Sequence, residues 1–327
     1  MSFVREYETI LKKSDGSIYS INYSNGSFSV YDDEKNICNE KITNEDLSFV
    51  DVWFDIDNKD NIYGIINNKE GKILYFNELN NIKSKVSFYN YDKYKTLIKF
   101  PYIKNINDES HIIYYSMDAY DGNFFRLIHY NKVGDKIVKQ EIDKIECIIL
   151  SNFCVEFTKD MMYVFYFKIV DQLEEIFVSC YDLKSKVWGN PIQLTSTNKQ
   201  KVYLSLAKDN ENNFFVTYSE NNDSKYYCMC LKVNIFEGKI VNKNIKVVNE
   251  CVECTFPQII REGDSLYIQW VEYGKLIECF SKDSGESFSK GIIYSKSIDS
   301  DFIRCNYGSN NLEDKDLSLT TVFLEYW

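Results

Sequence analysis

Alanine and proline are scarce in this chain of 327 residues, which has only Ala119, Ala207 and three prolines. Alanine is the strongest helix former, whereas the abundant Tyr, Phe and Ile suit half-buried strands, so the composition disfavours long helices. The prolines Pro101, Pro191 and Pro257 lie near the ends of predicted strands, where a missing N–H is tolerated. The sequence therefore predicts an all-β protein.

Long apolar runs and an excess of basic residues are also absent. No segment approaches the ~18 consecutive apolar residues of a membrane helix, and the N-terminal residues contain no apolar core of signal-peptide length. We therefore expect a cytoplasmic protein without a membrane partner. The formal net charge of -11 argues against nucleic acid as a partner, because nucleic-acid binders need a basic face. In such a chain the ten cysteines are expected to be reduced thiols, several of them buried.

The chain does contain an internal repeat. A polar turn followed by an apolar strand with an aromatic residue recurs roughly every 44 to 52 residues, which is the range of four-stranded propeller blades. These strands are predicted to begin near Ser17, Asn61, Ile112, Met161, Asn213, Ser265 and, with a weaker pattern, Leu317.

Each repeat divides into four short strands joined by turns rich in Asp, Asn and Gly, residues that bond to nearby backbone or adopt positive φ. The four-strand order fits residues 3–43, 47–88, 95–145, 148–194, 200–248 and 254–293, and residues 301–326 supply only half a set. We predict one β-propeller domain over residues 1–327, with about seven four-stranded antiparallel blades and a short last blade. Six blades are the alternative.

The segment from Ser281 to Phe288 resembles the Asp box, Ser-x-Asp-x-Gly-x-x-aromatic, and falls at the predicted turn between the third and fourth strands of the sixth repeat. In such a turn we expect the Asp283 carboxylate to accept backbone N–H bonds, Gly285 to adopt positive φ, and Phe288 to pack between sheets. The chain thereby resembles the Asp-box (BNR-repeat, sialidase-like) β-propeller superfamily, which includes sialidases, other glycosidases and non-catalytic binding proteins. The equivalent turn of the fourth repeat, residues 182–188, is a degenerate relative without the glycine.

The resemblance implies a set of candidate catalytic residues. A sialidase-type enzyme would grip a substrate carboxylate with three arginines, and would use a Tyr/Glu nucleophile pair and an Asp acid/base in the central funnel. The arginine candidates are Arg5, Arg261 and Arg304. Further candidates are Glu272, Tyr273, Asp118 and Asp121, which lie in polar turns that could ring the mouth of the funnel and act as acid and base. In the competing interpretation the arginines form ion pairs and the acidic residues belong to solvated turns.

Two classes of function remain open. The favoured one is a non-catalytic interaction or ligand-binding propeller, with a protein or glycan as partner, because no catalytic constellation is complete. The alternative is a glycoside hydrolase of sialidase type, which requires Arg5, Arg261 and Arg304 to converge near Glu272 or another carboxylate. An enzyme is therefore the less favoured interpretation. We expect no cofactor, no bound metal ion and a monomer.

Overall fold

The computed structural model describes residues 6–23, 27–32, 35–42, 47–79, 82–120, 122, 124–146, 151–250 and 252–325. These residues form strands and two short 3-10 helices, η1 (Ser295–Ile298) and η2 (Leu312–Asp314). The contacts divide the chain into two compact units, which are described separately. Unit 1 contains the described parts of Cys147–Ile303 and Asp316–Trp327, and unit 2 contains Glu6–Glu146 and Arg304–Lys315.

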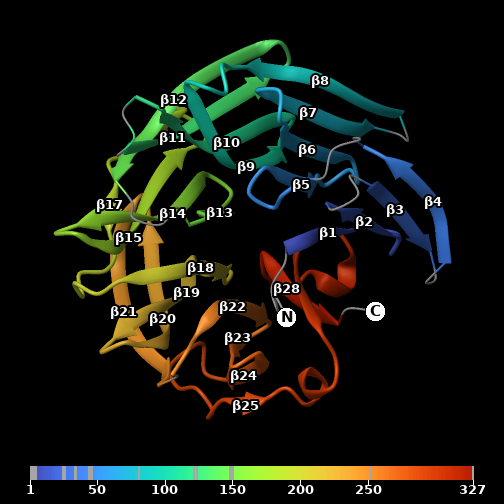
Figure 1. Ribbon diagram of the computed structural model, residues 1–327. Helices are drawn as coiled ribbons and strands as arrows, with labels where there is room; N and C mark the ends of the chain where they lie inside the picture. Colours follow the sequence, from blue (N-terminus) through green and yellow to red (C-terminus); the bar gives the residue numbers. More distant parts are fainter. Residues whose placement is uncertain are drawn as a thin grey trace. The chain divides into compact units, whose positions relative to one another are not determined.

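Unit 2 holds three sheets, one for each of the first three repeats (Figure 1). Within each sheet, consecutive strands pair in antiparallel fashion. The first sheet contains β1 (Glu6–Lys12), β2 (Ile18–Asn22), β3 (Ser27–Asp32) and β4 (Lys35–Lys41); the second contains β5 (Val52–Ile56), β6 (Ile62–Asn67), β7 (Lys72–Leu79) and β8 (Ile82–Asn90). The third contains β9 (Thr96–Ile106), β10 (Glu109–Asp118), β11 (Phe124–Val133) and β12 (Lys136–Glu146).

Unit 1 holds the sheets of the fourth, fifth and sixth repeats (Figure 1). The fourth sheet contains β13 (Cys154–Phe157), β14 (Met161–Val170), β15 (Leu173–Asp182), β16 (Val187–Trp188) and β17 (Ile192–Gln193). The fifth contains β18 (Lys201–Lys208), β19 (Asn213–Asn222), β20 (Lys225–Phe236) and β21 (Lys239–Asn249). The sixth contains β22 (Thr255–Glu262), β23 (Ser265–Glu272), β24 (Lys275–Ser281) and β25 (Ile292–Ile293). Unit 1 also includes β28 (Thr321–Glu325).

The all-β propeller class is confirmed, but with six blades, so the expectation of seven was wrong. The strand predicted at Leu317 is β27 (Leu317–Ser318), which pairs with β22 in the sixth sheet. The strand before it, β26 (Phe302–Ser309), pairs in parallel with β1 of the first sheet. A separate two-stranded hairpin is only marginally stable, whereas sheet edges offer unpaired N–H and C=O groups. The C-terminal strands therefore extend existing sheets and form no seventh blade.

The other predicted strand starts agree with the structure. Ile112 lies inside β10, which begins at Glu109, and the remaining five strands begin at the predicted residue or one residue later. Apolar side chains from alternate strand positions fill the space between neighbouring sheets in each unit. Between the fourth and fifth sheets, the Tyr163 and Phe214 ring centroids are 4.7 Å apart. This packing fixes the separation of the sheets and brings their end turns close together.

The described cysteines bear out the expectation that several are buried. Seven of them are buried, and they lie on strands or directly before them. Burial raises the pKa of the Cys180 thiol to about 12 and, with smaller opposing effects of two lysines, that of Cys230 to about 12 as well. These thiols are therefore protonated at neutral pH and act as small apolar side chains.

A partly buried ion pair joins the second and third sheets, and its carboxylate predicts a pH-dependent effect on stability. Asp55 Oδ1 accepts a hydrogen bond from Lys104 Nζ at 2.8 Å, while Oδ2 is buried without a hydrogen-bond partner among the described residues. Burial raises the pKa of Asp55, against the opposing effect of Lys104. The folded-state pKa of Asp55 therefore lies above its unfolded-state value, and protonation of the carboxyl favours folding. The free energy of unfolding of the wild type decreases as pH rises from the unfolded-state pKa through the folded-state pKa.

We therefore expect the stability of the Asp55→Asn variant, relative to the wild type, to increase from about pH 4 to pH 7, because asparagine does not titrate. Urea unfolding at several pH values measures this difference. A difference that stays constant over the range would show that Asp55 has the same pKa in the folded and unfolded states.

Candidate ligand-binding site

The catalytic candidates from the sequence are not gathered in one place within unit 1. Arg261 pairs with Leu266 near one end of the β22–β23 ladder, and Glu272 lies at the other end, six residues further along β23. At about 3.3 Å per residue, this spacing separates their backbones by roughly 20 Å. Arg5 and Asp121 lie outside the described residues.

The unit 1 candidates take part in local backbone contacts. Arg261 Nη1 donates a hydrogen bond to the Lys208 carbonyl at 3.5 Å. The Glu272 carboxylate accepts the Val252 N–H at 3.0 Å. Tyr273 has a φ of 48° in the turn after β23 and is 68% exposed. Each contact fits a role in joining strands or shaping a turn.

The unit 2 candidates are Asp118 and Arg304. Asp118 ends β10, and its Oδ1 accepts the Tyr120 N–H at 3.0 Å, which is the turn role that the competing interpretation expects. Arg304 is buried on β26, where its backbone is paired with Glu6 of β1. Asp118 thus belongs to the third sheet, whereas Arg304 lies on a strand paired with the first sheet.

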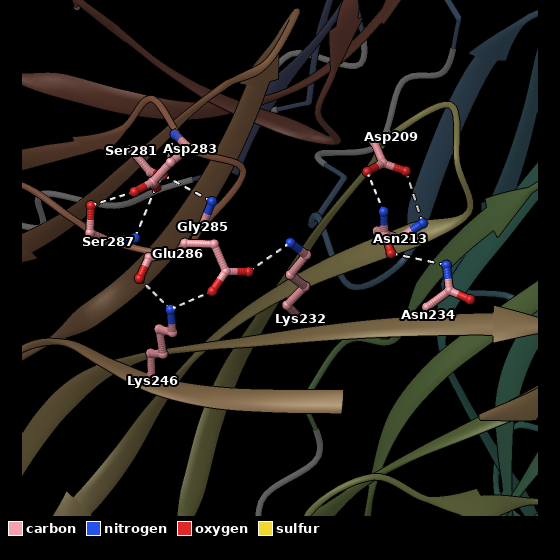
Figure 2. Close-up of polar contacts among 10 residues, drawn as sticks. All are labelled: Asp209, Asn213, Lys232, Asn234, Lys246, Ser281, Asp283, Gly285, Glu286 and Ser287. Carbon is pink, nitrogen blue, oxygen red and sulfur yellow. Dashed lines mark hydrogen bonds and ion pairs between the residues drawn. The ribbon is translucent and has the colours of Figure 1, made fainter. Parts of the chain in front are cut away.

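The segment Ser281 to Phe288 forms the turn between β24 and β25 (Figure 2). The Asp283 carboxylate accepts the Ser287 N–H at 2.9 Å and the Ser287 hydroxyl at 2.6 Å. Ser281 Oγ donates to Asp283 at 2.7 Å and accepts the Gly285 N–H at 2.9 Å. The hydroxyls of Ser287 and Ser281 are the main reason that the pKa of Asp283 lies well below its usual range.

The local expectations for this turn are confirmed. Asp283 accepts a backbone N–H, Gly285 has a φ of 81°, and Phe288 packs against the core cluster of the fifth and sixth sheets. Because the Asp283 carboxylate is already bonded within the turn, its role here is structural.

Within the units, some of the gaps between neighbouring sheets are closed by polar contacts. Between the fifth and sixth sheets, the Glu286 carboxylate binds Lys232 on β20 and Lys246 on β21, at 3.0 Å each (Figure 2). Between the first and second sheets, Asn310 Nδ2 and the Ser14 N–H donate to the Asp60 carboxylate, at 2.9 and 3.1 Å. These contacts connect end turns to the adjacent sheet.

Beside the packed core between the second and third sheets, their end turns and strand ends enclose a cavity of about 430 Å³. We call it the polar cleft. It is lined by residues 57–59, by four residues of segment 105–110, by Tyr63, Tyr75 and Asn77, and by Lys132 and Gly134. The lining comes from the turns β5–β6, β9–β10 and β11–β12 and from neighbouring strand ends.

Two tyrosines form the aromatic part of the polar cleft. The rings of Tyr63 and Tyr75 are edge to face, with centroids 6.2 Å apart. Lys132 Nζ lies 5.4 Å from the Tyr75 ring centroid, and Ser110 Oγ lies 3.3 Å from the Tyr75 hydroxyl. Burial is the main reason that the pKa values of both tyrosines are raised, so both hydroxyls are protonated at neutral pH.

The two carboxylates of the polar cleft are engaged within the protein. Asp57 accepts the backbone N–H groups of Lys59 and Asn61 and the Asn61 side-chain amide, at 2.8 to 3.0 Å. Asp108 forms an ion pair with Lys59 Nζ at 2.8 Å. The groups that remain for a ligand are mainly amides and hydroxyls beside aromatic rings.

The Asp57 turn has a counterpart in unit 1. Asp209 Oδ1 accepts the Asn213 N–H at 2.9 Å and Asp209 Oδ2 accepts the Asn213 side-chain amide at 2.7 Å (Figure 2). The sequence is rich in Asp and Asn at both turns, and the same side-chain contacts recur there. It carried no signal that the turn at Asp57 borders a cleft, because the lining of that cleft comes from two sheets.

A second cavity, of about 730 Å³, lies where end turns of the fourth and fifth sheets meet. We call it the acidic cleft. Its lining includes the aromatic side chains Tyr163, Trp188 and Phe236 and the carboxylates Asp160, Asp182 and Glu237. It contains no lysine, arginine or histidine. The two clefts thus occupy similar places in the repeat but differ in charge.

Metal ligands do not cluster within the part of the chain that the structure describes. No group of three or more His, Cys, Asp or Glu residues is arranged to hold a metal ion there. His111 and His129 are neighbours, with Nδ1 of the first 3.1 Å from Nε2 of the second, and both are buried. Among the same residues, no helix has the length and apolar character needed to cross a membrane.

Comparison with known proteins adds evidence on the fold. No protein-family model and no curated protein sequence matches the chain. A catalytically inactive virginiamycin B lyase from Staphylococcus aureus, solved with quinupristin, matches with a TM-score of 0.54 and 13% identity, covering 98% of this chain and 92% of that one. An alpha-L-arabinanase from Penicillium chrysogenum matches with a TM-score of 0.52 and 9% identity, covering 84% and 92%.

An alpha-L-arabinofuranosidase of Fusarium graminearum, solved with arabinobiose, matches with a TM-score of 0.50 and 10% identity, again covering 84% of this chain and 92% of that one. At such low identities these likenesses are informative about the fold and not about activity. They agree with the β-propeller fold described above.

Proposed function

We propose that this protein is a non-catalytic β-propeller that binds a neutral saccharide in the polar cleft. The observation that carries the proposal is the composition of the cleft, in which tyrosine rings lie beside side-chain amides and hydroxyls while both carboxylates are already bonded. Its volume falls within the roughly 300–1,000 Å³ typical of small-molecule sites. A saccharide offers hydroxyls for the amides and C–H faces for the rings.

A glycoside hydrolase would need a different set of groups in this cleft. Glycoside hydrolysis needs two carboxyl groups placed on either side of the scissile bond, one of them available as an acid. In the polar cleft Asp57 is bonded to its own turn and Asp108 is paired with Lys59. We therefore favour binding without turnover.

We also propose that the chain is a divergent relative of the Asp-box propellers. The support for this is the turn from Ser281 to Phe288, in which the side chains and the glycine of the motif make the contacts that its chemistry predicts. Such a turn stabilises a hairpin and is compatible with a binding protein or an enzyme.

Screening the purified protein on a glycan array, followed by calorimetric titration with the best ligand, tests the binding proposal. We expect Tyr75→Phe to weaken binding by about tenfold, the effect of losing one hydrogen bond. Tyr94→Phe is the matched control, because Tyr94 is 82% exposed and does not line the polar cleft. We expect it to bind like the wild type.

Three outcomes would count against the proposal. These are an array without any saccharide ligand, equal affinities for the Tyr75→Phe and Tyr94→Phe proteins, and turnover of fluorogenic glycosides, including a sialoside. Turnover would favour the hydrolase alternative.

A further inference from the structure

We propose that the acidic cleft of unit 1 is a separate binding site for a primary alkylammonium group, such as the side chain of a lysine or one end of a diamine. This proposal does not rest on saccharide binding, because the acidic cleft and the polar cleft share no residue.

The acidic cleft is formed by end turns of two adjacent sheets. Asp160 lies in the turn β13–β14 and Asp182 at the end of β15 in the fourth sheet, whereas Glu237 lies in the turn β20–β21 of the fifth. In that turn Gly238 has a φ of 71°, and a Cβ there would lie 3.7 Å from Cys180 Cβ. The positive φ favours glycine at this position, and the turn of the fifth sheet lies in contact with the fourth sheet.

The carboxylates of the acidic cleft lack compensating positive charge in its lining. The Asp182 carboxylate accepts the Ser185 and Lys184 N–H groups at 2.7 and 2.9 Å, and these bonds lower its pKa and keep it ionised. Asp160 and Glu237 form no hydrogen bond or ion pair through their side chains with other described residues. Four lysines are adjacent in sequence to the lining, Lys159, Lys184, Lys186 and Lys239; none of them lines the cleft, although the charge of Lys184 contributes to lowering the pKa of Asp182. The lining therefore favours a cation.

The aromatic side chains of the acidic cleft suit an alkyl chain that carries this cation. Trp188 packs against Tyr181 with ring centroids 5.0 Å apart, while Phe236 and Val187 are each 58% exposed at the cleft. An ammonium group within about 6 Å of an aromatic ring is attracted by its π face, and the methylene groups pack on apolar surface. An anionic ligand would meet three carboxylates.

In the neighbouring gap, between the fifth and sixth sheets, a carboxylate and an aromatic ring also lie close together. There a lysine of the protein supplies the cation. There Lys232 Nζ lies 3.0 Å from the Glu286 carboxylate and 5.8 Å from the Phe215 ring centroid. In the polar cleft, Lys132 lies over the Tyr75 ring. The lining of the acidic cleft has carboxylates and rings but no lysine. We infer that a ligand ammonium occupies the corresponding place.

Calorimetric titration of the full-length protein with cadaverine, and with a peptide containing one lysine, tests the proposal and distinguishes a free diamine from a protein partner. We expect at least one of the two probes to bind. Acetylation of its amine should abolish binding, and raising the salt concentration should weaken it because the attraction is between charges. We expect Glu237→Gln and Phe236→Ala each to weaken binding by about threefold to tenfold, in line with one exposed ion pair or cation–π contact.

Matched controls are Glu313→Gln and Phe280→Ala, since Glu313 has an 83% exposed side chain, Phe280 is 39% exposed, and neither lines the acidic cleft. The proposal is overturned if neither probe binds, if the acetylated probe binds equally well, or if the cleft variants and the controls bind alike. Saccharide titrations of the same variants should match the wild type, so failure here is distinct from failure of the saccharide proposal.

Discussion

Replacing Lys201 with methionine is expected to lower the free energy of unfolding by about 3–5 kcal/mol at pH 7, the cost of removing one partner from a buried ion pair. The Lys201 side chain is fully buried, and its Nζ lies 2.9 Å from the Glu175 carboxylate and 3.6 Å from that of Glu220. It also donates hydrogen bonds to the Glu174 and Lys199 carbonyls, at 3.0 and 2.8 Å. Methionine fills a similar volume but leaves two buried carboxylates without a counter-charge.

Urea unfolding followed by circular dichroism measures this effect. Lys184→Met is the matched control, because Lys184 is exposed, and we expect a change within about 0.5 kcal/mol. Adding Glu175→Gln and Glu220→Gln to Lys201→Met should recover much of the lost stability, since the uncompensated charges are then gone. A loss below about 1 kcal/mol in Lys201→Met would show that the buried lysine contributes little.

A second large effect is expected at Gly64, in the middle of β6. A Cβ at this position would lie 2.4 Å from a ring carbon of Phe54, which is 2% exposed and packs edge to face on Phe76 at a centroid distance of 5.8 Å. Phe54 belongs to the buried core between the first and second sheets, so a shift of its ring would disturb that packing. We therefore expect Gly64→Ala to destabilise the protein by about 2–3 kcal/mol through overpacking.

Gly122→Ala is the control for this substitution, because a Cβ there has no atom within 4 Å and the φ of Gly122 is not in the left-handed region. The double variant Gly64→Ala with Phe54→Leu tests the mechanism, since a smaller side chain relieves the clash. Its loss should be smaller than the sum of the two single losses, a coupling of about 0.5–3 kcal/mol. Strict additivity would rule out the Phe54 contact as the cause.

The strand starts and the turn chemistry could be predicted from the sequence because both depend on residues close together in the chain. Alternating apolar residues give a strand its buried face, and the Asp57 and Asp283 turns are held by side chains within four residues of one another. The number of blades could not be predicted in this way. Leu317 begins a strand with a suitable pattern, but its pairing partner Glu262 belongs to the sheet of the sixth repeat, far from Leu317 in the sequence.

The candidate sites depended even more on tertiary structure. Asp57 and Trp188 are ordinary turn or hairpin residues in the sequence, and they line clefts only because neighbouring sheets place other turns beside them. Lys201 is one of many lysines in the sequence, and nothing near it indicates that two carboxylates bury its charge. The sequence by itself determined the all-β class, the repeat and the hairpin turns, because short-range periodicity and turn chemistry specify them. Only the tertiary structure decided where the end turns of neighbouring sheets contact each other and where they leave a cleft, because those contacts join residues far apart in the chain.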